Sequence, residues 1–384
     1  MTTAYKYLIL LVSAFAVMAG CRQQVPSDPL KPTDASTRYA SLLQMQDVDD
    51  GVTVCRIMNP WQPERIAIQY LLVADSTSMP NVHELEKRFG QFQVLHTPLE
   101  RQTVTSSCHV WLLGQLNALN TVGVICDADY VMLPAAQKAL NDGEILDGGN
   151  AMAPNAEVIG AAMSQCVWVS PYEATSQQIV SAQLPDIPII YCADYMETDP
   201  LARAEWMRFY GRLVGRSAVA DSLFETVEAA YLAMTAADSI ADHRPSLLPD
   251  LPFGATWYVA GGRSTLGQMY RDAGFSYFWQ DDTHGGSLAL SPEAVFQRAH
   301  DADIWLFKHF DESQDESFTL DWLLRQSPLF SEFKAVKTKK VFGCNTAACD
   351  YFDSTPFRPD QLLHELKMIA AGNVDSLTYF KPIL

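Results

Sequence analysis

Residues 200–242 read PLARAEWMRFYGRLVGRSAVADSLFETVEAAYLAMTAADSIAD, and this stretch decides the fold. No proline follows Pro200 within it, and its apolar residues recur at spacings of three and four; they include Leu223, Phe224, Val227, Ala230, Tyr231 and Met234. That spacing is typical of a helix with one buried face. At 1.5 Å per residue, about 20 residues would form a stiff helix of roughly 30 Å. The segment therefore predicts a single long rigid linking helix.

On both sides of this segment, short apolar runs alternate with segments of helical length, which is the α/β pattern. We expect strands near 52–57, 66–73, 102–106, 123–126, 166–170, 187–191, 255–260, 303–307 and 340–342. We expect helices near 110–119, 155–163, 265–273, 292–300 and 359–371. The sequence HRPSLLPDLPFG (243–254) is expected to be an irregular connection, because three prolines interrupt it.

The pattern predicts two Rossmann-like α/β lobes, residues 39–198 and 243–384, joined by the linking segment 199–242. In such folds a ligand cleft lies between the lobes, at the carboxyl ends of the strands. About 345 residues remain after the N-terminal 38, which is more than a domain with a single hydrophobic core usually contains.

The N-terminus has the features of an export signal. Lys6 precedes an uncharged apolar run at 7–19, which is short for a permanent membrane helix, and Ala19-Gly20-Cys21 follows. Small residues before a cysteine suit a lipoprotein signal peptidase, so residues 1–20 are predicted to be removed and Cys21 to be lipidated. An ordinary signal peptide with an incidental cysteine is the alternative. Residues 21–38 are proline-containing and mostly polar, which is typical of a flexible tether.

Composition limits the partners. The formal net charge is −18, and so acidic a surface repels phosphate backbones and excludes nucleic acid. No second apolar segment is long enough to cross a membrane, so we expect membrane contact only through the lipid anchor. Seven further cysteines show no CxxC or zinc spacing, and no cofactor or metal is predicted; Cys344 and Cys349, which flank NTAA, can form a bridge in an oxidising compartment.

Several stretches together resemble a known family. They are YCADYMETDPLARAEWMRFY (191–210), GATWYVAGGRS (254–264), YRDAGFSYFWQDD (270–282), LSPEAVFQRAHDADIWLF (290–307), AVKTKKVFGCN (335–345) and FRPDQLLHELKMIA (357–370). Their order and spacing resemble the substrate-binding proteins of ABC importers for iron-siderophores, heme and cobalamin. The resemblance runs from about residue 95 to Leu384, and residues 39–94 are the least similar part and are expected to carry an extra hairpin.

The resemblance implies a non-enzymatic, periplasmic, lipid-anchored protein that captures a small-molecule metal chelate and delivers it to an ABC permease and its ATPase. In the family, one glutamate on each lobe contacts arginines of the permease. Glu157 and Glu293 match that placement, because each stands in the first turn of a predicted helix, one per lobe. The alternative is that both glutamates only complement their helix dipoles.

Candidate cleft residues follow the expected strands of both lobes. They are Ser107, His109, Tyr130, Tyr172, Glu173, Tyr258, Arg263 and His284. Tyrosines offer flat apolar surface for a large ligand, a guanidinium can neutralise an anionic chelate, and a histidine can ligate a metal axially. A second cluster at the start of the linking segment consists of Tyr195, Glu197 and the stretch Arg203-Ala204-Glu205-Trp206. It either reaches the cleft floor or forms capping and ion-pair contacts that orient the helix.

The favoured cargo is an iron chelate, siderophore or heme. A corrinoid such as cobalamin, or a chelate hand-off lipoprotein without a permease, remains an alternative. The chain has no GxSxG, HExxH or GxxxxGK[ST] motif, so a hydrolase built on Ser107, His109 and Asp129 is a remote alternative.

Overall fold

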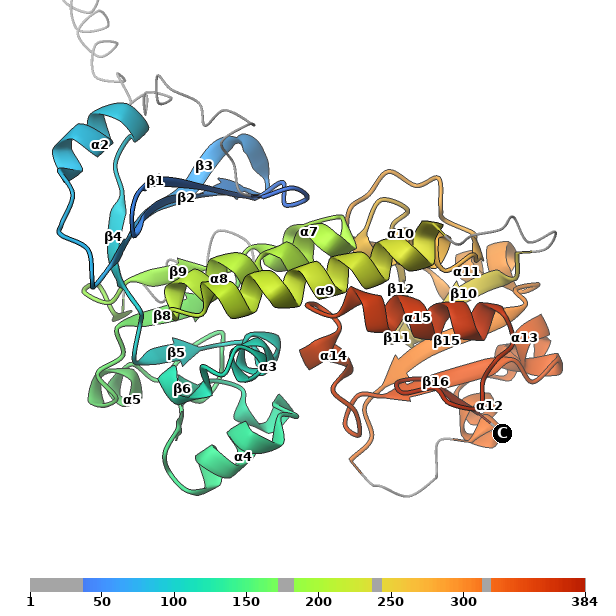
Figure 1. The fold of residues 1–384 in the computed structure, drawn as a ribbon. Helices are drawn as coiled ribbons and strands as arrows, with labels where there is room; N and C mark the ends of the chain where they lie inside the picture. Colours follow the sequence, from blue (N-terminus) through green and yellow to red (C-terminus); the bar gives the residue numbers. More distant parts are fainter. Residues whose placement is uncertain (1–36, 172–182, 237–243, 313–318, 384) are drawn as a thin grey trace, which may run out of the picture.

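The computed structural model describes residues 37–171, 183–236, 244–312 and 319–383 (Figure 1). The expectations for the signal peptide, Cys21, Tyr172 and Glu173 lie outside the described residues. No helix within these ranges is both long and apolar enough to cross a membrane.

The chain begins with a sheet of its own, in the order β1-β2-β3-β4. Strands β1 (Leu43–Asp49), β2 (Val52–Asn59) and β3 (Gln62–Ala74) form an antiparallel meander, and helix α2 (Val82–Phe89) leads to β4 (Gln93–Thr97), which runs parallel to β3. Val52, Val54, Leu71, Val73 and Phe89 form a small separate core on one face of this sheet. The expected extra hairpin is therefore part of a four-stranded sheet.

The first lobe contains a five-stranded parallel sheet in the order β7-β6-β5-β8-β9. Its strands are β5 (Gln102–Val104), β6 (Val122–Ile125), β7 (Leu146–Asp147), β8 (Cys166–Val169) and β9 (Ile189–Tyr191). Helices α3 (Ser107–Gln115), α4 (Pro134–Asn141) and α5 (Ala156–Ala161) connect them. The strands predicted here are confirmed. Strand β7 was not predicted, because a strand of two residues has no recognisable sequence pattern.

The linking segment differs from the single predicted helix. It contains α7 (Pro200–Glu205), α8 (Met207–Leu213) and α9 (Ser217–Ala236), and only α9 has the predicted length of 20 residues. Gly215 between α8 and α9 has φ +65°, a conformation that L side chains rarely adopt. A Cβ on Gly211 would lie 2.4 Å from Cβ of Ala220, so glycine allows α8 to approach α9 closely. These two glycines explain the break between α8 and α9, which apolar periodicity did not predict.

The second lobe has two sheets. The larger one, in the order β13-β10-β15-β16-β17, is parallel except for β17. Its strands are β10 (Ser246–Pro249), β13 (Ser276–Tyr277), β15 (Ile304–His309), β16 (Val341–Asn345) and β17 (Lys381–Pro382). The smaller sheet is antiparallel and joins β11 (Pro252–Phe253), β12 (Thr256–Ala260) and β14 (Ser287–Leu290).

Two expectations for this lobe are corrected. The expected irregular connection at 243–254 contains β10, which lies between β13 and β15, where Leu247 and Leu248 are fully buried. The strand expected at 255–260 exists as β12, but it belongs to the antiparallel sheet rather than to a Rossmann-like one. Pro249 is the last residue of β10, and a proline in so short a segment made the sequence resemble a loop.

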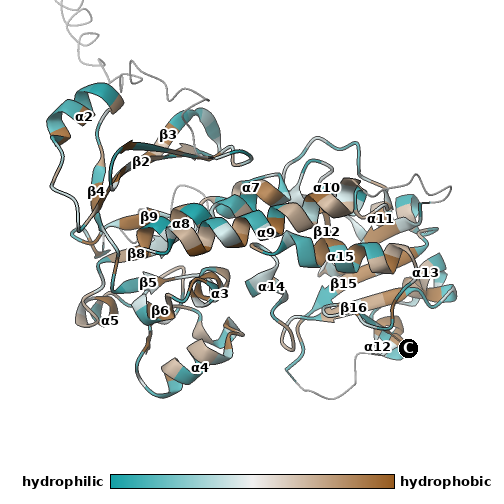
Figure 2. Cartoon of the chain, viewed as in Figure 1, coloured by the Kyte–Doolittle hydropathy of each residue, from teal (hydrophilic) through white to brown (hydrophobic). Residues whose placement is uncertain are grey.

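Helices complete the second lobe. They are α10 (Thr265–Asp272), α11 (Pro292–Ala299), α12 (Leu320–Gln326), α13 (Lys334–Lys337), α14 (Tyr351–Ser354) and α15 (Pro359–Ala370). Figure 2 shows mostly hydrophobic residues along β15 and β16 and a mostly hydrophilic α2. Cys344 and Cys349 are free thiols whose sulfur atoms lie 3.7 Å apart.

In Figure 1 the sheet β1–β4 lies on one side of α7, α8 and α9, and α3 and α14 lie on the other side. The fold is thus mixed α/β, with two parallel sheets connected by the α7–α9 segment.

Candidate functional site

The carboxyl ends of the two parallel sheets face each other. Tyr130 follows β6 in the first lobe, Phe310 follows β15 in the second, and their ring centroids lie 6.1 Å apart. Both side chains remain open to solvent, with 61% of Tyr130 and 54% of Phe310 exposed. We call this pair the aromatic rim. Its position is the one expected for a ligand cleft between α/β lobes.

The floor beside the aromatic rim is a polar contact between α14 and the first lobe. One oxygen of Asp353 accepts a hydrogen bond from the backbone N–H of Met132 at 2.8 Å, and Ser107 also hydrogen-bonds to Asp353. Burial raises the pKa of the Asp353 carboxyl, and these two hydrogen bonds oppose that rise. Ser107 therefore stands at the first turn of α3 as expected, but its partner is a side chain of the other lobe.

Sequence reasoning selected Tyr130 and Ser107 but missed their partners Phe310 and Asp353. A signal existed for Phe310, because it lies three residues after the strand predicted at 303–307 and so belongs to the same edge of the sheet. No comparable signal existed for Asp353, which lies on a helix of four residues.

The expectation that His109 lines the cleft as an axial ligand is wrong. His109 is 1% exposed, and its Nε2 lies 2.9 Å from Oδ1 of Asp194. The rings of Trp168, Tyr210 and Phe357 surround it at centroid distances of 5.6, 5.0 and 6.0 Å. The imidazole is part of the packed interior, because α3 directs this side chain toward the sheet.

Among the described residues, Cys108, His109 and Asp194 form the one group whose ligand atoms are close enough for a metal, within 4.8 Å of one another. The surroundings do not suit a cation. Arg203 contributes its Nε 3.3 Å from Oδ2 of Asp194, and the Tyr210 hydroxyl donates to Oδ1 at 2.8 Å. Burial alone would raise the pKa of Asp194, but His109 and Arg203 outweigh it and hold the pKa well below its usual range. The carboxylate is already neutralised by these protein groups, so we interpret the cluster as structural.

Three other cleft candidates stand on segments of the second lobe other than the one that carries Phe310. Tyr258 is exposed on β12 between the buried residues Trp257 and Val259, on the outer face of the antiparallel sheet. Arg263 is exposed in the turn after β12, where its backbone N–H donates to the carbonyl of His284 at 3.2 Å. His284 is exposed, and its Nδ1 lies 2.9 Å from Oδ1 of Asp282.

This turn is set against the start of the linking segment. A Cβ on Gly285 would lie 2.9 Å from the Thr198 methyl group, and Thr265 donates its hydroxyl to the carbonyl of Glu197 at 2.9 Å. Backbone carbonyls of residues 279–286 also crowd Gly261 and Gly262. The glycines of the GGRS turn therefore serve close packing of the chain.

A family model described as periplasmic binding protein matches residues 125–348, which is more than half of the chain. The chain belongs to the periplasmic binding protein family.

The chain is also similar to individual proteins. An uncharacterized lipoprotein of Methanocaldococcus jannaschii is 27% identical over 297 residues, covering 74% of this chain and 68% of its own. The solved Fe3+-hydroxamate transport protein of Saccharomonospora viridis is 19% identical with a TM-score of 0.55, covering 72% of this chain and 96% of its own. The periplasmic heme-binding protein of Roseiflexus sp. is 18% identical with a TM-score of 0.55, covering 71% and 98%. These solved structures share the fold, and the family model begins after the sheet β1–β4.

In this periplasmic binding protein, the two candidate docking glutamates have similar local settings. Glu157 is exposed in the first turn of α5, whose N-cap Asn155 accepts from the N–H groups of Glu157 and Val158. Glu293 is exposed in the first turn of α11, whose N-cap Ser291 accepts from Ala294. Both carboxylates are therefore available to a partner, one on each lobe.

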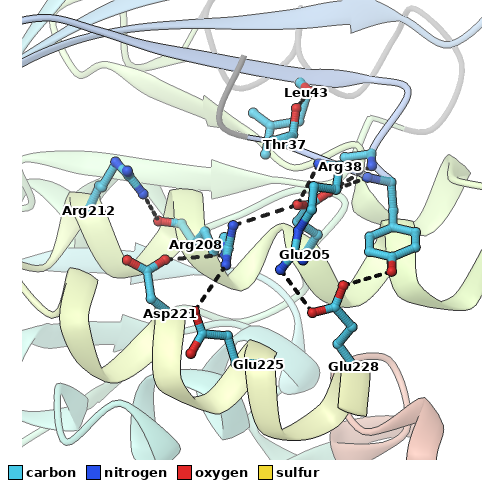
Figure 3. A network of polar contacts seen from close by, with 11 residues as sticks. Thr37, Arg38, Leu43, Glu205, Arg208, Arg212, Asp221, Glu225 and Glu228 are labelled. Atoms are coloured by element: carbon cyan, nitrogen blue, oxygen red, sulfur yellow. Dashed lines mark hydrogen bonds and ion pairs between the residues drawn. The ribbon is translucent and has the colours of Figure 1, made fainter. Parts of the chain in front are cut away.

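The cluster at the start of the linking segment orients the chain. Oε1 of Glu205 accepts from the N–H of Arg38 at 2.7 Å, and Oε2 accepts from Tyr39 and Ala40 at 2.8 and 2.9 Å. Glu228 on α9 accepts from Arg38 and from the Tyr39 hydroxyl (Figure 3).

Glu197 completes the cluster. It accepts hydrogen bonds from the backbone N–H groups of Ser41 and Leu42 and from the Trp206 indole. We call residues 38–42 with Glu197, Glu205 and Glu228 the N-terminal clamp. All three carboxylates are buried and fully engaged with the chain, which agrees with the capping interpretation and not with a role at the cleft floor.

Proposed function

We propose that this protein captures a metal chelate, foremost an iron chelate, in the cleft between its lobes and delivers it to the permease of an ABC importer. The observation that carries the proposal is the aromatic rim. Two exposed rings from opposite lobes stand at the carboxyl ends of two parallel sheets, in a chain of a binding-protein family. Flat apolar surface of this kind suits a large ring or siderophore body. Two proteins of the same fold are an Fe3+-hydroxamate transport protein and a heme-binding protein.

The experiment is a titration of the full-length protein, in a neutral detergent, with ferric siderophores, hemin and cyanocobalamin, followed by absorbance and tryptophan fluorescence. We expect saturable binding of one class at micromolar affinity or better, without turnover. Phe310→Ala should weaken that binding about two- to tenfold, since an aromatic contact that becomes buried on binding contributes about 0.5–1.5 kcal/mol beyond the burial of its area. Absence of binding to every chelate would overturn the proposal, and binding of cyanocobalamin alone would assign the cleft to a corrinoid.

Anchoring and docking belong to the same proposal. Cys21 is proposed as the lipidated residue, in keeping with a lipoprotein relative. Glu157 and Glu293 are proposed to contact the permease. Charge pairs at the edge of a protein–protein interface fix how the partners are aligned more than they add affinity.

Charge reversal at both glutamates should abolish chelate uptake by cells while chelate affinity stays within a few-fold. The control is a charge reversal at Glu64, which is exposed on β3 and far in the sequence from α5 and α11. Unchanged uptake in the double variant would remove the docking role and favour a hand-off protein without a permease.

A further inference from the structure

The loops at the carboxyl ends of the parallel strands carry acidic side chains. Of the loops that follow the parallel strands within the described residues, those after β5, β6, β7, β8, β10, β15 and β16 cover 105–106, 126–133, 148–155, 170–171, 250–251, 310–312 and 346–350. Their sequences contain no lysine or arginine, and their carboxylates are Asp127, Asp129, Asp250, Asp311, Glu312 and Asp350. Asp129 and Glu312 are exposed and lie one and two residues from the members of the aromatic rim.

Two cations near these loops are already paired with the protein's own carboxylates. Lys308, at the end of β15, forms an ion pair with Asp250, and Arg203 forms one with Asp194. Neither pair leaves a positive charge for a ligand. The pair with Lys308 also neutralises Asp250, so the other loop carboxylates account for the negative charge. A cleft lined by one sign of charge focuses its field on the ligand, because the low-dielectric walls on both sides reduce screening.

The aromatic rim favours the same sign of ligand charge. Ring faces carry a negative quadrupole, which attracts cations and gives nothing to an anion. Tyr130 and Phe310 thus add apolar surface for a ligand body and a preference for positive or absent charge.

Arg263 is the residue from which sequence reasoning expected neutralisation of an anionic chelate. In the structure it follows β12 of the antiparallel sheet and lies beside His284, next to the start of the linking segment. Among the described residues it forms no ion pair with the carboxylates that flank the aromatic rim.

We infer that the cleft selects neutral or positively charged chelates and discriminates against anionic ones. This inference rests on the proposed function and names the substrate class. Three hydroxamates each lose one proton and together balance the charge of Fe3+, so ferric trihydroxamates are neutral, or positive where a free ammonium group is present. Ferric tris-catecholates and hemin are anionic through their catecholate and propionate oxygens. The favoured cargo is therefore a ferric trihydroxamate.

The test compares probes of different charge on the full-length protein. The probes are ferrioxamine B, which is positively charged, ferrichrome, which is neutral, ferric enterobactin, which is strongly anionic, and hemin. We expect the two hydroxamates to bind at least about tenfold more tightly than the anionic probes, and added salt to weaken binding of ferrioxamine B only.

A paired variant isolates the carboxylates. Asp129→Asn with Glu312→Gln should weaken binding of ferrioxamine B about three- to tenfold, since each exposed charge contact changes affinity by a few-fold, and should leave ferrichrome within about twofold. Glu64→Gln on β3 is the matched control and should change neither. Both substituted positions are exposed, so folding is retained and can be checked by circular dichroism.

The outcomes separate the inference from the proposed function. Anionic chelates that bind as tightly as the hydroxamates, and whose binding is lost in Arg263→Gln, would overturn the inference while the chelate-binding function stands. Failure of all four probes to bind would overturn the proposed function and the inference with it.

Discussion

The N-terminal clamp and the aromatic rim both join segments that are far apart in the chain, yet they use opposite chemistry. The clamp places carboxylates with 0–11% exposed side chains, such as Glu205 and Glu228, against backbone N–H groups, arginine and a tyrosine hydroxyl. The rim places two rings, each more than half exposed, in one contact between the two lobes. Buried charge that is fully hydrogen-bonded is costly to separate, whereas an exposed aromatic pair contributes about 1 kcal/mol. The comparison indicates a permanent joint on one side of α7–α9 and a separable contact on the other.

The largest effect is expected at the centre of the clamp. Glu205→Gln replaces one carboxylate oxygen by an NH2 group facing backbone N–H donors, so the free energy of unfolding should fall by about 3 kcal/mol. Urea unfolding measures this. Glu225→Gln, at a 66% exposed position 3.9 Å from Arg208, is the control and should change stability by less than about 0.5 kcal/mol. Equal effects of both substitutions would show that the clamp does not stabilise the joint.

A smaller effect, with a defined sign in pH, is expected at the cleft floor. The raised pKa of Asp353 means that the folded state binds its proton more tightly than the unfolded state does. This contribution to stability is fully present below the usual aspartate pKa and is lost as pH rises through the raised pKa.

Asp353→Asn removes that titration. The wild type should therefore gain stability relative to the variant when urea unfolding is moved from about pH 7 to about pH 5. Asp129→Asn, at an exposed position, should show no such pH-dependent difference. If the wild type instead lost stability relative to Asp353→Asn toward low pH, the carboxyl would have a lowered pKa in the folded protein.

The smallest stability effect is expected at the aromatic rim. Tyr130→Ala and Phe310→Ala should each lower the free energy of unfolding by less than about 1 kcal/mol, with a coupling energy of about 0.5 kcal/mol in a double-mutant cycle. A loss above about 2 kcal/mol for either single substitution would mean that the rim is a structural joint, like the clamp.

The same contrast explains what the sequence could predict. Strands such as β2, β6, β8 and β15 were predictable because each is a run of apolar residues long enough to stand out. Strand β10 was not, since prolines stand at both ends of this short run. The break before α9 depends on Gly215 and on the contact of Gly211 with Ala220, which involves two helices at once.

For the site residues too, the place along the chain could be predicted and the contacts could not. Tyr130 could be chosen from its place after a strand, but its contact with Phe310 depends on how two lobes meet. His109 shares that placement with Ser107, and only the direction of its side chain toward Asp194 decides that it is buried. Pairing between distant segments is set by packing, and a single sequence records it weakly.

The clamp also has a mechanical consequence. Under the proposed lipidation of Cys21, the segment between the membrane and residue 37 would have about 16 residue steps and would span at most roughly 55 Å. Its fixed end is held by Glu205 and Glu228 on α7 and α9, on the side of these helices where β1–β4 lie (Figures 1 and 3). A pull on the N-terminal segment would therefore be transmitted first to the connecting helices α7 and α9 and not to the aromatic rim between the lobes.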